Sequence, residues 1–232
     1  MVNPSDISMT PVSRFRDRKE AGKALARSLG EHYRRPHPLV LALPRGGVPV
    51  GREIAQALHI PLDVFVVRKI AMPEQTEVAI GALATGSVQL LDDALIEEAK
   101  IPASMVSFLI VKETLELQRR EDLYRGGRPP PEISERSVIL VDDGVATGYT
   151  MRVAILALKK LNPAHVTVAI PVGAPETCKT IEGLVDELIC LAQPSPLHAV
   201  GLWYDHFPPV TDAEVREGIA EASHVTDDRS AR

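Results

Sequence analysis

A chain of 232 residues with 45% hydrophobic side chains is long enough for one large domain, or for one domain with an appended piece, and is too apolar for a disordered protein. Its net charge of −5 at pH 7 argues against nucleic acid or an anionic membrane surface as the main partner. Two cysteines without metal-ligand spacing, and the lack of a basic leader or a membrane-spanning apolar run, predict a cytoplasmic protein.

Helices and strands alternate in the first part of the chain. A capping box, Asp-Arg-Lys-Glu at residues 17–20, predicts the start of a helix. Short apolar runs predict strands at 39–43 and 62–67, and the apolar spacing between them predicts a helix over 48–58.

An insertion at about 70–131 interrupts this alternation. Glycines within an alternating stretch predict a two-stranded ribbon at 81–86, and a long helix is expected over 104–124, before a linker rich in Gly and Pro. Apolar residues recur near heptad spacing in this helix, so it offers a surface for a partner or a flap over a site. A homo-oligomer is therefore one expected assembly.

The second half of the chain returns to alternating elements. Strands are expected at 138–141, 165–172 and 188–191, with helices at 149–161 and 175–185 between them. This spacing predicts right-handed crossovers and an α/β fold with a mostly parallel sheet flanked by helices. Ligands of such folds bind at the carboxyl ends of the strands.

The thirteen residues 138–150, VILVDDGVATGYT, join a buried strand to a helix through two acids and a turn rich in Gly and Thr. Amides at the helix N-terminus and the hydroxyls of Thr147 and Thr150 can hold a phosphate. Asp142 and Asp143 would repel that phosphate unless they accept hydrogen bonds from sugar hydroxyls or hold a hydrated Mg²⁺. The pattern therefore favours a phosphorylated sugar. The alternative is a plain strand-turn-helix junction in which Asp143 only caps the turn.

This segment resembles the binding motif of type I phosphoribosyltransferases: a hydrophobic run, two acids, four positions ending in Thr, then Gly-x-Thr. The resemblance implies 5-phosphoribosyl 1-pyrophosphate (PRPP) as the ligand and Mg²⁺ as the cofactor. It places Asp142 and Asp143 on the ribose hydroxyls and on the metal, the latter through water. The loop implied around the 5-phosphate comprises Ala146, Thr147, Gly148, Tyr149 and Thr150. Gly144 departs from the family pattern, which usually has a branched aliphatic residue there.

The resemblance also implies how the chain is divided. A phosphoribosyltransferase-like core is expected over residues 14–191, including a flexible loop and the long helix in the insertion. A small C-terminal hood with a closing helix is expected over 192–225, and a second capping box at 211–214 marks the start of that helix.

A second glycine-bearing turn, residues 43–47, also follows a strand and precedes a helix. Gly46 and Gly47 lack the Cβ atoms that would block close approach of the backbone, and Arg45 adds a guanidinium for phosphate oxygens. In the family a short loop at this place holds pyrophosphate. The alternative is a tight turn with a surface arginine.

Two further groups of residues have both a functional and a structural interpretation. Arg68 and Lys69 are expected to end the next strand at the same sheet edge, where a cation can neutralise departing pyrophosphate, or to be solvated there. Trp203, the only Trp, is expected to stack on a flat nitrogenous acceptor, or else to pack the C-terminal tail onto the body. His198 and His206 flank it and could donate to a substrate.

These residues and the family resemblance together predict a Mg²⁺-dependent phosphoribosyltransferase, a pentosyltransferase of the kind used in nucleotide salvage. It would move the phosphoribosyl group from PRPP to a nitrogenous acceptor and release pyrophosphate. Asp142, Asp143 and Lys69 are the expected catalytic residues. The alternatives are a PRPP- or nucleotide-binding regulator of the same fold and a hydrolase of phosphosugars. Residues 71–86 lack the catalytic-loop signature of the orotate and hypoxanthine enzymes, so no acceptor is predicted.

Overall fold

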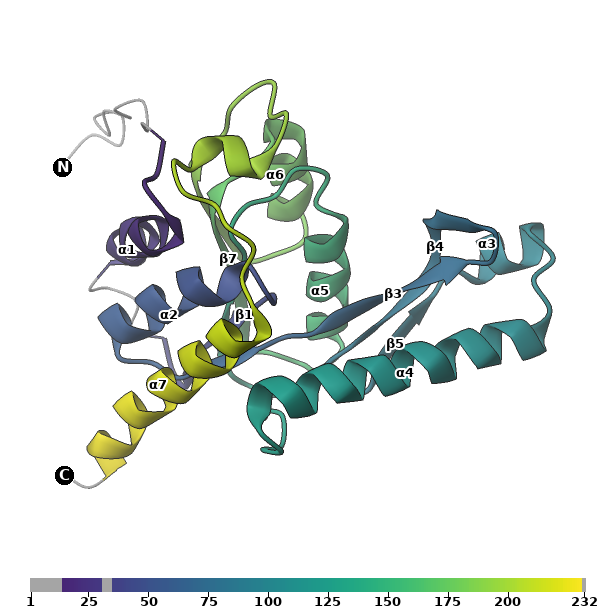
Figure 1. Cartoon of the computed structure of the whole chain (residues 1–232), viewed down its shortest axis with the longest axis horizontal. Coiled ribbons are helices and arrows are strands. Elements are labelled where there is room, and N and C mark those ends of the chain that lie inside the picture. Colours follow the sequence, from purple (N-terminus) through teal and green to yellow (C-terminus); the bar gives the residue numbers. More distant parts are fainter. Residues whose placement is uncertain (1–13, 31–34, 231–232) are drawn as a thin grey trace.

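A computed structural model describes residues 14–30 and 35–230 of the chain. Five parallel strands form the central sheet, in the order β2-β1-β6-β7-β8 (Figure 1). Their bounds are Leu62–Val64 for β2, Pro38–Ala42 for β1, Ser137–Val141 for β6, His165–Val172 for β7 and Glu187–Ala192 for β8. The predicted α/β fold with a mostly parallel sheet is confirmed, and the strand that precedes the acid pair lies at its centre.

Helices cover both faces of this sheet, as strands buried on both sides require. One face carries α1 (Arg18–Leu29), α2 (Gly47–Leu58) and α7 (Asp212–Ser230), and the other carries α5 (Tyr149–Lys159) and α6 (Pro175–Glu182). Side chains alternate along β1: Val40 and Ala42 join the core formed with α2, whereas Leu39 and Leu41 join the core formed with α5. None of the helices described is both long enough and apolar enough to cross a membrane.

Both predicted capping boxes open helices. At the start of α1, the carboxylate of Asp17 accepts a hydrogen bond from the amide of Glu20, 2.8 Å away. At the start of α7, the amide of Thr211 donates to the carboxylate of Glu214 at 2.7 Å. Local sequence therefore fixes where α1 and α7 begin, and both helices begin beside the candidate site described below.

The insertion forms an arm that projects from the body of the molecule (Figure 1). The arm contains the antiparallel strands β3 (Val67–Met72), β4 (Gln75–Ala84) and β5 (Val88–Leu91), then α3 (Asp93–Glu98) and the long α4 (Ala103–Arg125). The predicted ribbon at 81–86 is wrong in extent, because β4 starts six residues earlier and pairs on both sides. The predicted helix over 104–124 is confirmed.

The predicted strand at 62–67 is wrong, because the chain changes sheets within that apolar run. β2 ends at Val64, and the backbone of Val66 instead pairs with Thr85, the residue that directly follows β4. The amide of Val66 donates to the Thr85 hydroxyl and its carbonyl accepts from the Thr85 amide, each at 2.9 Å. Arg68 and Lys69 consequently lie inside β3, not at the end of a strand of the parallel sheet.

A buried arginine secures the arm to the body. Arg125, the last residue of α4, forms ion pairs with Asp63 of β2 at 2.8 Å and with Glu121 at 2.9 Å, and it donates to the carbonyl of Val64 at 2.8 Å. Further out on α4, Phe108, Val111 and Leu115 are about 60% exposed. The interpretation of this exposed face as a surface for another copy of the chain, or as a flap, stays a prediction.

Candidate functional site

Two loops meet at the carboxyl edge of the central sheet. β1 and β6 pair in register, with Ala42 opposite Val141, so both chains leave the sheet at the same level. A Cβ on Gly47 would stand only 2.6 Å from the carbonyl oxygen of Val141, and a Cβ on Gly46 would overlap a carboxylate oxygen of Asp143. The two glycines predicted to allow close approach are therefore packed directly against the acid pair.

A cavity of about 160 Å³ lies within the loop that follows the first acid. Its lining comprises Asp142, Gly144, Val145, Ala146, Thr147, Gly148, Tyr149, Thr150 and Met151. Gly148 caps α5 with a φ of 70°, a conformation that favours glycine. Free amides at the N-terminus of α5 and the helix dipole both favour an anion in this cavity. All five residues predicted to surround a 5-phosphate line it.

The loop is held from behind by the start of α6 and the segment before it. Val145 exchanges backbone hydrogen bonds with Val172 and Ala174, at 2.9 and 3.0 Å. The hydroxyl of Thr177 donates to the carbonyl of Ala146 at 2.6 Å. These contacts give the loop a fixed shape.

Packing explains the glycine that departs from the family pattern. Gly144 has a φ of 154°, and a Cβ there would stand 2.6 Å from Val200 and 2.8 Å from Val172. The side chain of Val200, from the C-terminal segment, occupies the space that a branched residue would need. Gly144 therefore permits this segment to pack against the loop.

The two acids have different surroundings. Asp142 lines the cavity, and its carboxylate accepts the amide of Asp143 at 2.9 Å. Burial, and then the charge of Asp143, hold the pKa of Asp142 well above its usual range. Burial also raises the pKa of Asp143, but a nearby arginine opposes this shift. Asp142 thus has the less compensated charge, which a hydroxyl donor or a cation would relieve.

That arginine is Arg18, the first residue of α1, and its role was not predicted from the sequence. Its Nε lies 2.8 Å from a carboxylate oxygen of Asp143, and both side chains are at most 15% exposed. The guanidinium also donates to the carbonyl of Pro208 at 2.7 Å and lies 3.7 Å from the centre of the Phe207 ring. The sequence pattern around Arg18 indicates only a helix start, so no local signal identifies this contact.

The aromatic C-terminal segment packs beside this ion pair. The hydroxyl of Tyr204 donates to the carbonyl of Asp143 at 2.6 Å, and burial raises the pKa of Tyr204. Trp203, within a short 3₁₀ helix (Val200–Trp203), is half-buried and packs near Phe15 and Tyr204. This placement agrees with the packing alternative for Trp203, and its stacking on an acceptor stays a prediction. The sequence singles out Tyr204 only as an aromatic neighbour of Trp203, and its hydrogen bond to Asp143 was not predicted.

The three basic side chains predicted to contact pyrophosphate lie in different parts of the structure. Arg45 is half-exposed and lies 3.7 Å from the carboxylate of Asp212, the first residue of α7. Arg68 forms an ion pair with Glu113 of α4 at 2.6 Å, which ties β3 to the long helix. Lys69 lies opposite Ala82 in the arm sheet.

The two histidines that flank Trp203 in the sequence are also candidate donors to a substrate. Neither His198 nor His206 lines the loop cavity.

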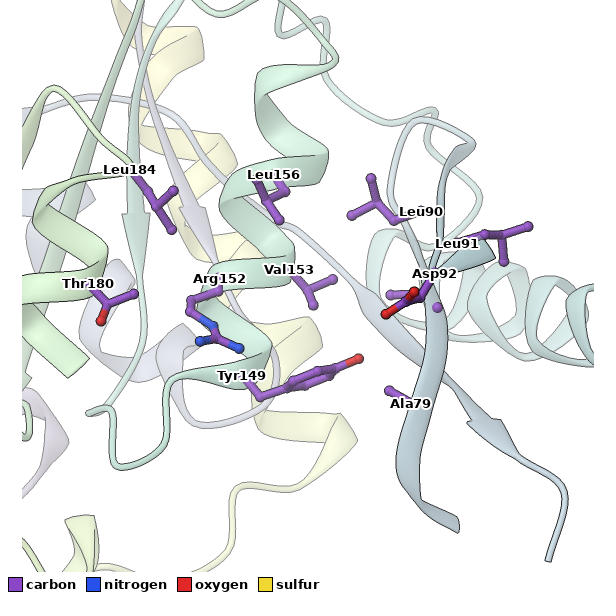
Figure 2. Close-up of a pocket in the computed structure, with 12 residues that line it drawn as sticks. Ala79, Leu90, Leu91, Asp92, Tyr149, Arg152, Val153, Leu156, Thr180 and Leu184 are labelled. Atoms are coloured by element: carbon purple, nitrogen blue, oxygen red, sulfur yellow. The ribbon is translucent and has the colours of Figure 1, made fainter. Parts of the chain in front are cut away.

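A larger pocket of about 420 Å³ separates α5 from the arm (Figure 2). Leu90 of β5 faces Val153 and Leu156 of α5 across it, and the ring of Tyr149 extends toward the arm. Tyr149 lines this pocket and the loop cavity, so the two spaces adjoin at the N-terminus of α5.

The donor set of the acid pair fits Mg²⁺ better than a metal held by protein side chains alone. Within the described ranges, no group of three or more His, Cys, Asp or Glu side chains could hold a metal. Mg²⁺ commonly uses one or two carboxylates together with waters and substrate phosphates. Asp142, with its incompletely compensated charge, offers such a carboxylate.

Three comparisons relate the chain to known proteins. The pattern of the phosphoribosyl transferase domain family matches residues 12–202. A protein of Mycobacterium tuberculosis H37Rv, named provisionally as a phosphoribosyl transferase, is 38% identical over 201 residues, which are 87% of this chain and 45% of that protein. The chain thus spans about half the length of the curated relatives it matches. The crystal structure of the protein TT1426 from Thermus thermophilus is 37% identical, with a TM-score of 0.79, and the match covers 90% of this chain and 98% of that one.

Proposed function

Because this chain belongs to the phosphoribosyl transferase family, we propose that it transfers the 5-phosphoribosyl group of PRPP to a nitrogenous acceptor and releases pyrophosphate. The observation that carries this proposal is the register of β1 and β6. It brings a glycine turn and an acid-bearing anion loop together at one sheet edge, as a ligand with phosphate at both ends requires.

Each end of PRPP would meet one of the two loops. The 5-phosphate would occupy the loop cavity at the N-terminus of α5, held by amides and by Thr147 and Thr150. Asp142 would accept a hydrogen bond from a ribose hydroxyl, with Asp143 beside it. The pyrophosphate would lie against Gly46 and Gly47, where Arg45 can reach its oxygens.

In the proposed reaction the bond from C1 to the pyrophosphate oxygen breaks and a bond from C1 to the acceptor nitrogen forms. The bonding electrons leave with pyrophosphate, and positive charge develops on the ribose. Asp142 and Asp143 would stabilise that positive charge, while Arg45 and Lys69 would stabilise the departing anion. Bound Mg²⁺ would neutralise part of the pyrophosphate charge. The segment after Ala192 would act as a hood over the acceptor.

A regulator that binds PRPP or a nucleotide without turnover is a second candidate, and the placement of the arginines favours it. Arg18 neutralises Asp143, and Arg68 is engaged by Glu113. Asp143 and Arg68 are thus already paired within the protein, and this leaves fewer unpaired charges at the site than the sequence predicts for stabilising the reacting ribose and pyrophosphate.

Binding and turnover, measured together, test the proposal. Calorimetry with Mg²⁺ should show PRPP binding, and labelled pyrophosphate should exchange into PRPP when the correct acceptor is supplied from a panel of bases and amines. Binding without turnover across the panel would support the regulator, and release of ribose 5-phosphate without an acceptor would support a hydrolase. No binding of PRPP would reject both the transferase and the PRPP-binding regulator. Asp142→Asn is the matched variant that should lose PRPP binding.

A further inference from the structure

The two cysteines of the chain, which have no metal-ligand spacing in the sequence, lie together in the structure. The sulfur of Cys178, in α6, is 3.6 Å from the sulfur of Cys190, in β8. A disulfide bond requires a separation of about 2.05 Å, so the two sulfurs need to approach by roughly 1.5 Å. Both thiols are free, Cys178 is 2% exposed and Cys190 is half-buried. The pair is therefore within reach of a covalent bond.

The surroundings make the two thiols chemically unequal. Cys178 follows Pro175, the first residue of α6, by three positions, so the helix N-terminus favours its thiolate. Contact with Cys190 lowers the pKa of Cys178, whereas the same contact and burial raise the pKa of Cys190. One nucleophilic sulfur beside one protonated sulfur suits formation of an internal disulfide.

Cys178 is also mechanically linked to the loop cavity. Its neighbour Thr177 donates to the carbonyl of Ala146 at 2.6 Å and packs against Gly148. The sulfur of Cys178 also packs against the backbone of Gly173, where a Cβ would stand only 2.5 Å from it. The residues on either side of Gly173, Val172 and Ala174, are those that form backbone hydrogen bonds with Val145. Displacement of Cys178 toward β8 would consequently move the supports of the loop.

We propose that Cys178 and Cys190 are a reversible redox modification site, whose disulfide weakens anion binding in the neighbouring loop cavity. The oxidant is a peroxide or a low-molecular-weight disulfide. With hydrogen peroxide, one thiolate attacks an oxygen, giving a sulfenic acid and hydroxide, which takes up the proton lost by that thiol to form water. The second sulfur then displaces the sulfenic hydroxyl, and with its own proton this leaves as a second water. Two thiols lose two electrons and one peroxide gains them. The coupling rests on the proposed phosphate site, whereas the disulfide itself does not.

The test uses the full chain after treatment with oxidised glutathione or hydrogen peroxide. Mass spectrometry and a count of free thiols should show one internal disulfide per chain, reversed by dithiothreitol and absent in Cys178→Ser and Cys190→Ser. Calorimetry should show the affinity for inorganic phosphate falling by roughly fivefold or more on oxidation, the lower end of typical coupling between sites. Hydrogen exchange should become faster at the amides of residues 145–148.

The outcomes separate the parts of the proposal. Two free thiols after equilibration with oxidant would overturn the modification site. A disulfide that leaves both hydrogen exchange and phosphate affinity unchanged would overturn the coupling. If even the reduced chain fails to bind phosphate, the proposed phosphate site fails, and hydrogen exchange alone still decides whether the disulfide moves the loop. Thr177→Val serves as the matched control, because loss of its hydroxyl should reduce the response of the loop to oxidation while the disulfide still forms.

Discussion

The guanidinium of Arg18 lies 2.8 Å from the carboxylate of Asp143, one of the two acids expected to contact ribose. The contact joins the first residue of α1 to the end of β6, 125 positions further along the chain. Its consequence is that the acid pair carries one neutralised and one poorly compensated charge, and the two acids should respond differently to mutation.

Arg18→Ala should lower the free energy of unfolding by about 2–4 kcal/mol. Removing one partner of a nearly buried ion pair leaves the other charge without compensation, which typically costs about 3–5 kcal/mol, and slight exposure reduces this. Urea unfolding at neutral pH measures the loss. Arg16→Ala is the control, since its partner Asp17 lies at the surface and Arg16 is 73% exposed. Equal losses in the two variants would contradict the stabilising role of the Arg18 pair.

Asp142→Asn should stabilise the ligand-free protein above about pH 4 while it weakens PRPP binding. The unfolded carboxyl loses its proton near 3.8, but the folded one does so only at a higher pH. As the pH rises through this window the folded state binds more protons than the unfolded state, so it loses stability, and the loss persists at higher pH. Asparagine avoids this loss, with a gain of about 0.5–2 kcal/mol. Urea titrations at pH 3 and pH 7 check it, because the gain should appear only at pH 7.

Gly47→Ala should destabilise the protein by about 1–3 kcal/mol, the usual range for overpacking. The new methyl group would stand 2.6 Å from a backbone carbonyl of β6, which cannot move without disturbing the central strand. Gly183→Ala is the matched control, since its nearest neighbours lie 3.7 Å away and its change should be within about 0.5 kcal/mol. Thermal unfolding compares the two, and a melting temperature for Gly47→Ala equal to that of the control would argue against close packing of the loops.

Arg45→Ala and Lys69→Ala should each weaken PRPP binding more than ribose 5-phosphate binding. Only PRPP carries a pyrophosphate, and a charge-assisted hydrogen bond contributes about 1.5–3 kcal/mol, or roughly tenfold to hundredfold in affinity. Calorimetry with Mg²⁺ measures both ligands, and Arg119→Ala, an exposed change on α4, is the control. For Lys69 the result also decides whether a residue of the arm sheet reaches the site. Equal losses for both ligands would remove either residue from the pyrophosphate site.

The parallel sheet and the two glycine-bearing loops at its edge could be predicted because their signals are local. Runs of apolar residues such as 138–141 indicate buried strands, and the carboxyl ends of parallel strands necessarily lie at the same edge of a sheet. The strand at 62–67 was mispredicted because an apolar run does not reveal which sheet its backbone joins. Thr85, 19 positions away from Val66, decides that point.

Contacts between distant segments account for what the sequence did not reveal about the site. Arg18 and Tyr204 meet Asp143 only after α1 and the C-terminal segment have been placed by the core. Val200 explains the unusual Gly144 in the same manner. The acid-loop motif predicts a site for an anion, but the charge balance around that site depends on tertiary structure.

The hydrogen bond from Arg18 to Pro208 joins residues 190 positions apart. A chain is synthesised from its N-terminus, and domains fold as units during synthesis. All five strands of the central sheet precede residue 193, so the sheet can assemble on the ribosome before Tyr204, Phe207 and Pro208 exist. Throughout that interval Arg18 lacks the ring and the carbonyl that hold its guanidinium against Asp143. The charge balance of the acid pair is thus completed only after the whole central sheet has been synthesised.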